Sequence, residues 1–191
     1  MSDRFKQGMS LAFGDQWPVR EIHFADNPGK DEITNFVVRH LVDVKPVVVA
    51  DGNTYSAFGN RVREALPDSR LVKFEGRVEA DEEATRILSA EIADGGSALV
   101  AVGSGTISDL CKYASSQAGK PYLVFPTAAS MNGYTSANAS IKVNQVKKTL
   151  PAKLPEAVFI DVQVIADAPV RLASSGFGDY ACRPTAQADW L

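Results

Sequence analysis

The clearest candidates for chemistry lie in residues 98–127, where a glycine turn separates an apolar run from a helical stripe. Residues 98–102 are typical of a buried strand, and Gly103, Ser104 and Gly105 interrupt them. Glycines let a ligand approach the backbone closely, and the first amides of a helix carry partial positive charge. The turn is therefore typical of a phosphate or pyrophosphate site, although a purely structural strand-to-helix turn can use the same glycines.

A helix is predicted directly after this turn. Apolar side chains recur at helical spacing from Thr106, and Thr106 and Asp109 have the spacing of a capping box. Gly119 is predicted to end the helix. Residues 122–125 are then predicted to form a second buried strand, with Thr127 just beyond its carboxyl end.

Asp51 is a second polar residue at a predicted strand end. Residues 46–50 form a β-branched run that is typical of an inner strand of a parallel sheet, and a helix is predicted over residues 55–66. An acidic residue at such a strand end can accept hydrogen bonds from a ribose. In the alternative interpretation, Asp51 and Asn53 only cap the helix.

Strands and helices alternate along the chain, which predicts βαβ units and one parallel sheet of Rossmann-like α/β type. Further strands are predicted at 19–24, 71–74 and 157–160, and helices at 31–42, 81–92 and, more briefly, from Pro169. Because ligands bind beyond the carboxyl ends of such strands, Asp51, the glycine turn and Thr127 are expected to face one crevice.

Residues 128–140 are rich in small and polar side chains and are too long for an ordinary connection, which favours a functional loop. A small β-hairpin is predicted from 141–143 and 146–150, and a solvated face is favoured over phosphate binding for its lysines: Lys142, Lys147, Lys148 and Lys153. His23 and His40 are predicted on a strand and at a helix end, and neither has the spacing of a metal ligand.

Composition narrows the class of protein. The 191 residues are 45% apolar and 23% charged, with a net charge of −3, so no nucleic-acid partner is expected. No segment resembles a membrane span or a secretory signal, and the two cysteines, Cys111 and Cys182, fit a reducing compartment. A cytoplasmic location is therefore expected.

The end of the sequence suggests a cut through a larger fold. A helix is predicted to begin at Asp179, with Pro184 interrupting it. Apolar surface around Phe177, Trp190 and Leu191 is expected to favour self-association, so a homo-oligomer is a further prediction.

Four motifs in order resemble the sn-glycerol-1-phosphate dehydrogenase family, within the wider glycerol dehydrogenase, iron-containing alcohol dehydrogenase and dehydroquinate synthase-like superfamily. They are DGNT at 51–54, GSGTISD at 103–109, PTAASMNGYTS at 126–136 and GFGD at 176–179. The resemblance implies an NAD(P)-binding α/β domain over residues 1–175 and, over 176–191, the start of a truncated helical metal-binding domain. It also implies hydride transfer between a nicotinamide and a small polyol phosphate, as in the interconversion of glycerol 1-phosphate and dihydroxyacetone phosphate.

The same resemblance assigns residues to roles. Asp51 contacts the adenosine ribose, Asn132 contacts the substrate, and Asp179 is the first ligand of a divalent metal, usually zinc, that acts as a Lewis acid. Asn132 and Asp179 are thus the implied catalytic residues. The implied cofactor-binding set is Asp51, Asn53, Thr54, Gly103, Ser104, Gly105, Thr106, Ile107, Ser108, Asp109, Thr127, Ser130 and Ser136.

Two departures from the family pattern affect these expectations. Asn132 stands where the family has an acidic residue, and the two histidines that complete the family's metal site have no counterpart after Asp179. With one of about three ligands, this chain is not expected to hold a catalytic metal tightly. A dinucleotide-binding module without catalysis and a phosphate-eliminating cyclase are the alternatives. NAD is favoured over NADP because Asp51 would repel a 2′-phosphate.

Overall fold

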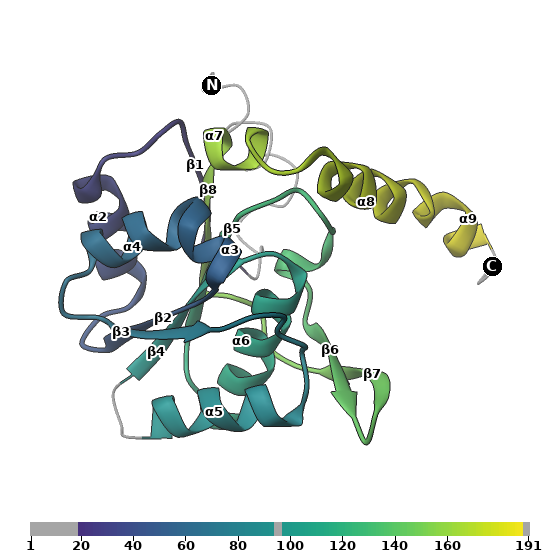
Figure 1. Ribbon diagram of the computed structural model, residues 1–191, viewed down its shortest axis with the longest axis horizontal. Coiled ribbons are helices and arrows are strands. Elements are labelled where there is room, and N and C mark those ends of the chain that lie inside the picture. Colours follow the sequence, from purple (N-terminus) through teal and green to yellow (C-terminus); the bar gives the residue numbers. More distant parts are fainter. Residues whose placement is uncertain (1–18, 94–96, 189–191) are drawn as a thin grey trace.

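The structure, a computed structural model that describes residues 19–93 and 97–188, is built on a six-stranded, wholly parallel sheet (Figure 1). The strand order is β1-β8-β5-β4-β2-β3. The strands are β1 (Glu21–Ala25), β2 (Lys45–Asp51), β3 (Arg70–Phe74), β4 (Ser97–Gly103), β5 (Tyr122–Pro126) and β8 (Ala157–Asp161). The prediction of a Rossmann-like parallel sheet is confirmed, with β1 as the predicted edge strand.

The inner strands are the ones with the longest apolar runs. Every residue of β4 and β5 is buried, and so is the stretch Val47–Ala50 of β2. Both faces of a parallel sheet are covered by helices, so these strands need apolar side chains on each side. The uninterrupted apolar runs therefore predicted correctly which strands lie at the centre of the sheet.

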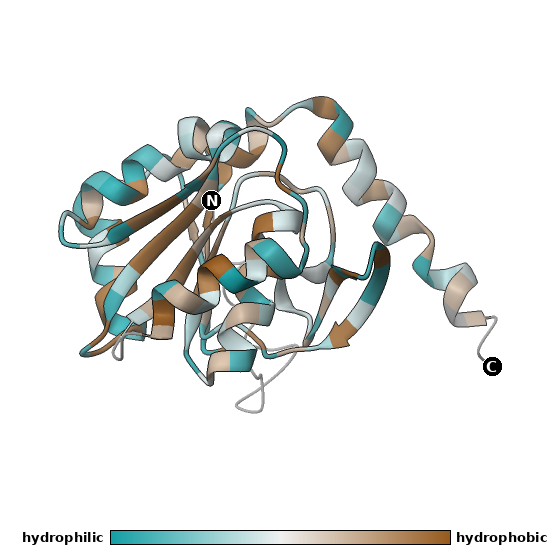
Figure 2. Ribbon diagram, turned by 60° about the horizontal axis from the view of Figure 1, so that its bottom comes forward, coloured by the Kyte–Doolittle hydropathy of each residue, from teal (hydrophilic) through white to brown (hydrophobic). Residues whose placement is uncertain are grey.

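Helices cover both faces of the sheet (Figures 1 and 2). On one face, α2 (Lys30–His40) and the segment after β2 pack Phe36 and Phe58 against the strands. On the other face, α5 (Glu82–Ala93) and α6 (Gly105–Ala118) contribute Leu88 and Leu110. The result is a three-layer sandwich in which the carboxyl ends of the strands stay open.

The helix after β2 begins earlier than predicted and is divided. It consists of α3 (Gly52–Thr54), the π-helical turn η2 (Tyr55–Gly59) and α4 (Asn60–Ala65). Asp51 starts it, because its carboxylate accepts from the Thr54 amide at 2.8 Å and the Thr54 hydroxyl accepts from the Asp51 amide at 3.0 Å. This capping box places the helix start at Gly52, ahead of the predicted 55.

The capping box predicted at Thr106 is wrong. Helix α6 begins at Gly105, with Ser104 as its N-cap and no side-chain cap. The Asp109 carboxylate instead contacts Lys112 and accepts from the backbone amide of Ser140, in the strand that follows the loop after β5. The predicted end is confirmed, because Gly119 adopts a left-handed conformation with φ of 63°.

The predicted hairpin is confirmed, as β6 (Asn138–Val143) and β7 (Val146–Pro151). Val143 pairs with Val146, so the connection contains two residues. Asn144 and Gln145 have φ of 51° and 66°, which is the geometry of a type I′ turn. The hairpin therefore forms without the glycine that such turns prefer.

The carboxyl-terminal helices differ from the prediction. After α7 (Val162–Ala166), helix α8 (Val170–Ala181) contains the GFGD motif in its interior, so the helix does not begin at Asp179. Helix α8 ends at Ala181, and α9 (Arg183–Ala188) follows Cys182 with Pro184 in its first turn, where proline is tolerated. Helix α8 extends from the body with Phe177 exposed, and Trp190 and Leu191 lie outside the described residues (Figure 1).

Candidate functional site

The carboxyl ends of β2, β4 and β5 bring three predicted groups together. Because these strands are neighbours, Asp51, the Gly103–Gly105 turn and Thr127 lie along one edge of the sheet, where the Thr127 amide donates to the Gly103 carbonyl at 3.3 Å. A cavity of about 760 Å³ opens beside them. This strand-end cleft is lined by Asn27, Asp51, Asn53, Thr54, Ser56, Ala57, Arg61, Ser104, Thr127, Gln163, Val164, Asp167, Ala168, Pro169, Arg171 and Leu172.

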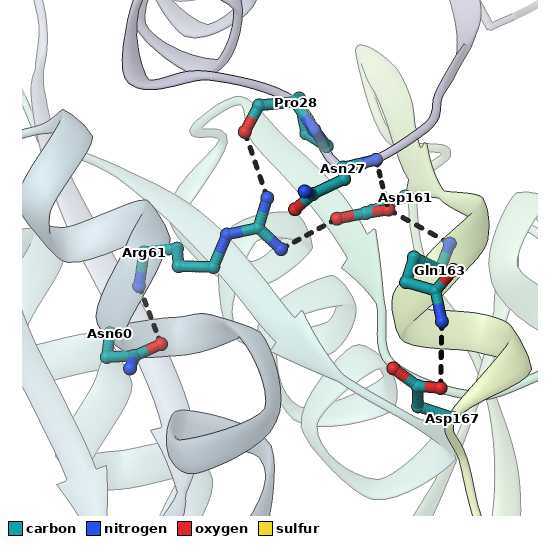
Figure 3. Close-up of polar contacts among 7 residues, drawn as sticks. All are labelled: Asn27, Pro28, Asn60, Arg61, Asp161, Gln163 and Asp167. Atoms are coloured by element: carbon teal, nitrogen blue, oxygen red, sulfur yellow. Dashed lines mark hydrogen bonds and ion pairs between the residues drawn. The ribbon is translucent and has the colours of Figure 1, made fainter.

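A buried carboxylate that the sequence did not single out fixes one wall of the strand-end cleft (Figure 3). Asp161, at the end of β8, is fully buried and accepts from the amides of Asn27 at 3.1 Å and Gln163 at 3.0 Å. Its other oxygen pairs with Arg61 at 2.8 Å, and Arg61 also donates to the Pro28 carbonyl at 2.9 Å. One carboxylate thus joins the β1–α2 turn, α4 and α7, each of which contributes residues to the cleft.

Asp51 has one carboxylate oxygen committed and one available. Its Oδ1 accepts from the Thr54 amide, which establishes the capping interpretation of Asp51. Within the described residues its Oδ2 has no hydrogen-bond partner, and Asp51 lines the strand-end cleft. The helix cap and a contact to a ligand hydroxyl can therefore use different oxygens of the same carboxylate.

The glycine turn presents backbone amides to solvent. Within α6 the first helical bond in the turn runs from the Ser108 amide to the Ser104 carbonyl, so the preceding amides have no partner inside the helix. A Cβ added at Gly105 would meet the Met131 sulfur at 3.4 Å and nothing closer. The start of α6 is therefore open, and its free amides have the arrangement that favours an anion.

Three residues of the predicted cofactor set lie in the core instead. A Cβ at Gly103 would come within 2.6 Å of Ile107 Cβ, so Gly103 is needed for packing against Ile107. Ile107 and Ser108 are each 1% exposed, and neither lines a cavity described here. The side chains of Ile107 and Ser108 pack in the core below the turn, so only the backbone amides of these residues could contact a ligand.

A second cavity lies on the other side of the turn. This hairpin cavity, about 560 Å³, is lined by Arg77, Val78, Glu79, Ala80, Gly105, Thr106, Asp109, Met131, Ser140, Lys142, Gln145 and Lys147. Lys142 donates to Glu79 at 2.7 Å, and this hydrogen bond and its charge lower the pKa of Glu79. Two hairpin lysines thus border a cavity, in addition to forming the solvated face that the sequence suggested.

A buried lysine connects the turn to the loop after β5, and sequence reasoning missed it. Lys112 is fully buried, and its ammonium donates to Asp109 Oδ1 at 3.2 Å, the Gly133 carbonyl at 2.8 Å and the Asn138 carbonyl at 3.0 Å. Asp109 Oδ2 also accepts from the Ser140 amide at 3.1 Å. The available signal was the spacing of Asp109 and Lys112 on adjacent turns of one helix.

The loop that contains Ser130 and Ser136 is ordered by its own contacts. The Tyr134 hydroxyl donates to the Ala128 carbonyl at 2.7 Å, and burial raises the pKa of Tyr134 to about 12. Ser136 accepts from the Asn138 amide at 3.1 Å. Neither Ser130 nor Ser136 lines the strand-end cleft or the hairpin cavity, so their predicted cofactor contacts stay untested predictions.

Helix α8 meets this loop at a glycine. A Cβ at Gly176 would come within 1.9 Å of the Ala129 carbonyl oxygen, so the helix approaches the loop as closely as a bare backbone permits. Three residues further along, Asp179 Oδ2 accepts from the Asn132 amide at 2.8 Å. The two residues predicted to be catalytic are therefore adjacent.

The residues present do not make up a metal site. Over residues 19–93 and 97–188, no group of three or more His, Cys, Asp or Glu side chains could hold a metal ion. His23 contacts Glu32 at 2.8 Å, and His40 contacts Glu21 at 2.9 Å. Asp179 is thus the single predicted ligand near Asn132, and the described donor set does not fit a catalytic zinc.

Comparison with known proteins gives a consistent family. Residues 27–169 match the family described as iron-containing alcohol dehydrogenase. The chain is 35% identical over 169 residues to the glycerol-1-phosphate dehydrogenase [NAD(P)+] of Bacillus velezensis, with 84% of this chain and 43% of that protein covered. It is 38% identical over 160 residues to the enzyme of the same name from Pyrococcus horikoshii, with 83% and 46% covered.

Solved structures agree on the fold. Glycerol dehydrogenase from Schizosaccharomyces pombe is 25% identical with a TM-score of 0.69, covering 86% of this chain and 42% of that one. Sulfoacetaldehyde reductase from Bifidobacterium kashiwanohense, solved in complex with NAD+, has a TM-score of 0.72 at 16% identity, covering 85% and 49%. The chain spans less than half the length of the relatives named here.

Proposed function

The chain belongs to the iron-containing alcohol dehydrogenase family, and from that premise we propose that it forms the NAD(P)-binding part of a glycerol-1-phosphate dehydrogenase-like oxidoreductase. The reaction is hydride transfer between a nicotinamide and the secondary carbon of a small polyol phosphate, with glycerol 1-phosphate and dihydroxyacetone phosphate as the proposed pair. The observation that supports this most is the open glycine turn at the start of α6, placed between Asp51 and Thr127.

The described residues fit a dinucleotide. The free amides of Gly105 and Thr106 would hold the pyrophosphate, and Asp51 Oδ2 would accept from the adenosine ribose. Asn53, Thr54 and Thr127 would line the remainder of its path. The bound nicotinamide supplies the hydride chemistry, while these residues orient it. Asp51 favours NAD, because its charge would repel a 2′-phosphate.

The domain division and the catalytic roles are proposals of the same kind. We place the cofactor-binding domain at residues 1–175 and the start of a helical, metal-binding domain at 176–191, a division that falls within α8. Asn132 would contact the substrate and Asp179 would be one ligand of a divalent metal. The donors in the described part of the chain do not complete that metal site.

A cytoplasmic location is part of the proposal, and the two free cysteines support it. No helix in the described part of the chain is long and apolar enough to cross a membrane. The proposed partner is a small phosphorylated polyol, and no nucleic acid is proposed. Self-association can be tested by gel filtration.

The first experiment is calorimetric titration of the 191-residue chain with NADH, with and without zinc. We expect binding that does not depend on zinc, because Asp179 does not line the strand-end cleft. An absence of NADH binding would contradict the proposed cofactor site. In a longer form of the protein that includes the remaining metal ligands, NADH binding without turnover of glycerol 1-phosphate would favour the non-catalytic alternative. Release of inorganic phosphate from a phosphorylated substrate would favour the cyclase.

Two variants locate the cofactor. Asp51→Ser keeps a good N-cap but removes the carboxylate, so thermal stability should stay close to wild type while NADH binding weakens about tenfold or more. Gly105→Asp has room for its Cβ and places a negative charge in the turn, so it should abolish NADH binding in a folded protein. Unchanged affinity in both variants would refute these assignments.

A further inference from the structure

The Arg61 guanidinium is held on one face and along one edge. Its central carbon lies over the ring of Phe58, 5.1 Å from the ring centroid, and Phe58 is fully buried. Along the edge, Nη1 donates to Asp161 Oδ2 at 2.8 Å and Nη2 donates to the Pro28 carbonyl at 2.9 Å (Figure 3). These contacts, which come from three directions, fix both the position and the orientation of the guanidinium.

The other face of the Arg61 guanidinium is open to the strand-end cleft. The Arg61 side chain is 31% exposed, although that of its partner Asp161 is 0% exposed, and Arg61 lines the cleft. Because Phe58 covers the face toward the core, the exposed face is the one directed away from Phe58. A planar guanidinium that is held in place with one free face is a platform on which a flat aromatic ring can stack.

The charges around Arg61 favour a neutral ring over a phosphate at this platform. Asp161 forms an ion pair with Arg61, so the positive charge of Arg61 is already matched. The strand-end cleft is lined by two further carboxylates, Asp51 and Asp167, and by one further guanidinium, Arg171, so its wall has no excess of positive charge. An anion would gain little there. A neutral ring can stack on the guanidinium face while the charge stays paired along the edge.

We infer that Arg61 is the platform for the adenine base of the dinucleotide and that Asp161 positions this platform. The inference rests on the proposed function, which places a dinucleotide in the strand-end cleft with its adenosine ribose at Asp51. Adenine is neutral, whereas the nicotinamide of NAD+ carries a positive charge that a guanidinium would repel. Apolar groups that suit a purine also line the cleft, from Ala57, Val164 and Leu172.

Asp161 acts through Arg61, because Asp161 does not itself line the strand-end cleft. The two oxygens of its carboxylate have separate partners. Oδ1 accepts from the backbone amides of Asn27 and Gln163, and Oδ2 accepts from Arg61. A change that affects only Oδ2 therefore releases the guanidinium while the contacts to the two backbone amides are kept.

The test is calorimetric titration of the 191-residue chain with AMP, ribose 5-phosphate and reduced nicotinamide mononucleotide. AMP and ribose 5-phosphate differ by the base, so the ratio of their dissociation constants measures what adenine contributes. In the wild type we expect AMP to bind about tenfold more tightly or better. Arg61→Lys keeps a positive charge for Asp161 but removes the planar face, so this preference should fall about fivefold or more. Binding of reduced nicotinamide mononucleotide should not change.

Arg70→Lys is the matched control for the loss of a planar guanidinium. Arg70 also contacts a carboxylate and a backbone carbonyl, both of Glu91, and its Nη1 lies 3.1 Å from Glu91 Oε2. Arg70 lines neither the strand-end cleft nor the hairpin cavity, so the preference for AMP over ribose 5-phosphate should equal that of the wild type. An equal fall in Arg70→Lys and Arg61→Lys would overturn the inference.

Asp161→Asn tests the positioning role. The asparagine keeps an oxygen for the two backbone amides but presents an amino group to Arg61, so the guanidinium loses its acceptor. The preference for AMP should fall as it does in Arg61→Lys, and the double variant should show no further fall, because both changes act on the same platform. If AMP and ribose 5-phosphate lose affinity equally, so that their ratio is unchanged, the role of Asp161 is purely structural and the inference is wrong.

The outcomes also separate this inference from the proposed function. If NADH does not bind the wild-type chain but AMP binds with a preference that depends on Arg61, the adenine platform is confirmed and the proposed redox cofactor is wrong. If AMP binds the wild type no more tightly than ribose 5-phosphate, the inference is wrong. A larger effect of Arg61→Lys on reduced nicotinamide mononucleotide than on AMP would place the other ring on the platform, which also refutes it.

Discussion

Replacing Lys112 by methionine is expected to lower the free energy of unfolding by about 3–5 kcal/mol, because it removes a fully buried ammonium from three acceptors. Methionine is similar in length and apolar, so the packing of the side-chain stem is largely kept. The Gly133 and Asn138 carbonyls each lose a donor, and Asp109 loses its opposite charge. The change is therefore electrostatic and polar rather than the creation of a cavity.

The magnitude follows from these contacts. A buried acceptor without its partner costs about 1–3 kcal/mol, and two carbonyls are affected. Asp109 retains the Ser140 amide and is partly exposed, which limits the additional cost of its unpaired charge. The total agrees with the range of about 3–5 kcal/mol for breaking a buried ion pair from one side. Such a loss is a large part of the stability of a typical domain, about 5–15 kcal/mol.

Urea unfolding followed by circular dichroism measures this loss, and Lys153→Met is the matched control. Lys153 also binds a backbone carbonyl, that of Lys120 at 2.9 Å, but is partly exposed, so water can replace it. The control should cost less than about 1 kcal/mol. Amide hydrogen exchange should in addition become faster at Ser140 in Lys112→Met and not in Lys153→Met.

A loss below about 1 kcal/mol in Lys112→Met, equal to that of the control, would refute the reasoning. A double-mutant cycle with Asp109→Asn adds a second criterion. The two residues are in contact, so their effects should differ from additivity by about 0.5–3 kcal/mol. Strict additivity would show that the Asp109–Lys112 contact does not contribute to the fold.

Three further changes have defined outcomes. Gly176→Ala places a methyl group against the Ala129 carbonyl, so α8 must move away from the loop. The backbone amide of Asn132, which donates to Asp179, should then exchange its hydrogen about tenfold faster or more. An unchanged exchange rate would contradict the close approach of α8 to the loop. Gln145→Gly relieves a positive φ in the hairpin turn and should raise the free energy of unfolding by about 0.5–1 kcal/mol in urea titrations. Burial raises the pKa of Glu21, but the hydrogen bond with His40 and nearby positive charges outweigh it, so the pKa is lowered from its ordinary value of 4.5. The ionised Glu21 carboxylate therefore contributes fully to the free energy of unfolding above pH 4.5, and this contribution is lost as the pH falls below that value. In Glu21→Gln, the urea midpoint should decrease less than in the wild type between about pH 5 and 3.

Much of the fold was predictable because the sheet is parallel and buried on both faces. The runs at β2, β4 and β5 are apolar without alternation, and such runs have few other uses in a chain of this composition. Helix starts were less predictable. The spacing of Thr106 and Asp109 matches a capping box, but the spacing does not determine which group the Asp109 carboxylate contacts. In the structure the carboxylate contacts Lys112 and the Ser140 amide, and these tertiary contacts replace the cap.

The candidate site was predictable where backbone position alone matters. Asp51, the glycine turn and Thr127 follow from strand ends, and the structure places Asp51, Ser104 and Thr127 at one cleft, with Gly105 on the neighbouring hairpin cavity. Contacts between segments distant in sequence were not predictable. Asp161 reads as an ordinary strand end, although its carboxylate joins three segments. Arg61 likewise has no local pattern, because its partner Asp161 lies 100 residues further along the chain.

The position of β1 has a consequence for the order of folding. It is the first described strand of the chain, yet its neighbour is β8, so Glu21 pairs with Ala157. On a ribosome that adds about 5–20 residues per second, β1 has to wait on the order of ten seconds for its neighbour to be synthesised. The central strands can pair in the meantime, and the sheet is completed at β1 last. A nascent chain stalled before β8 would thus carry β1 with both of its edges free, which is the state in which it is most exposed to pairing with another chain.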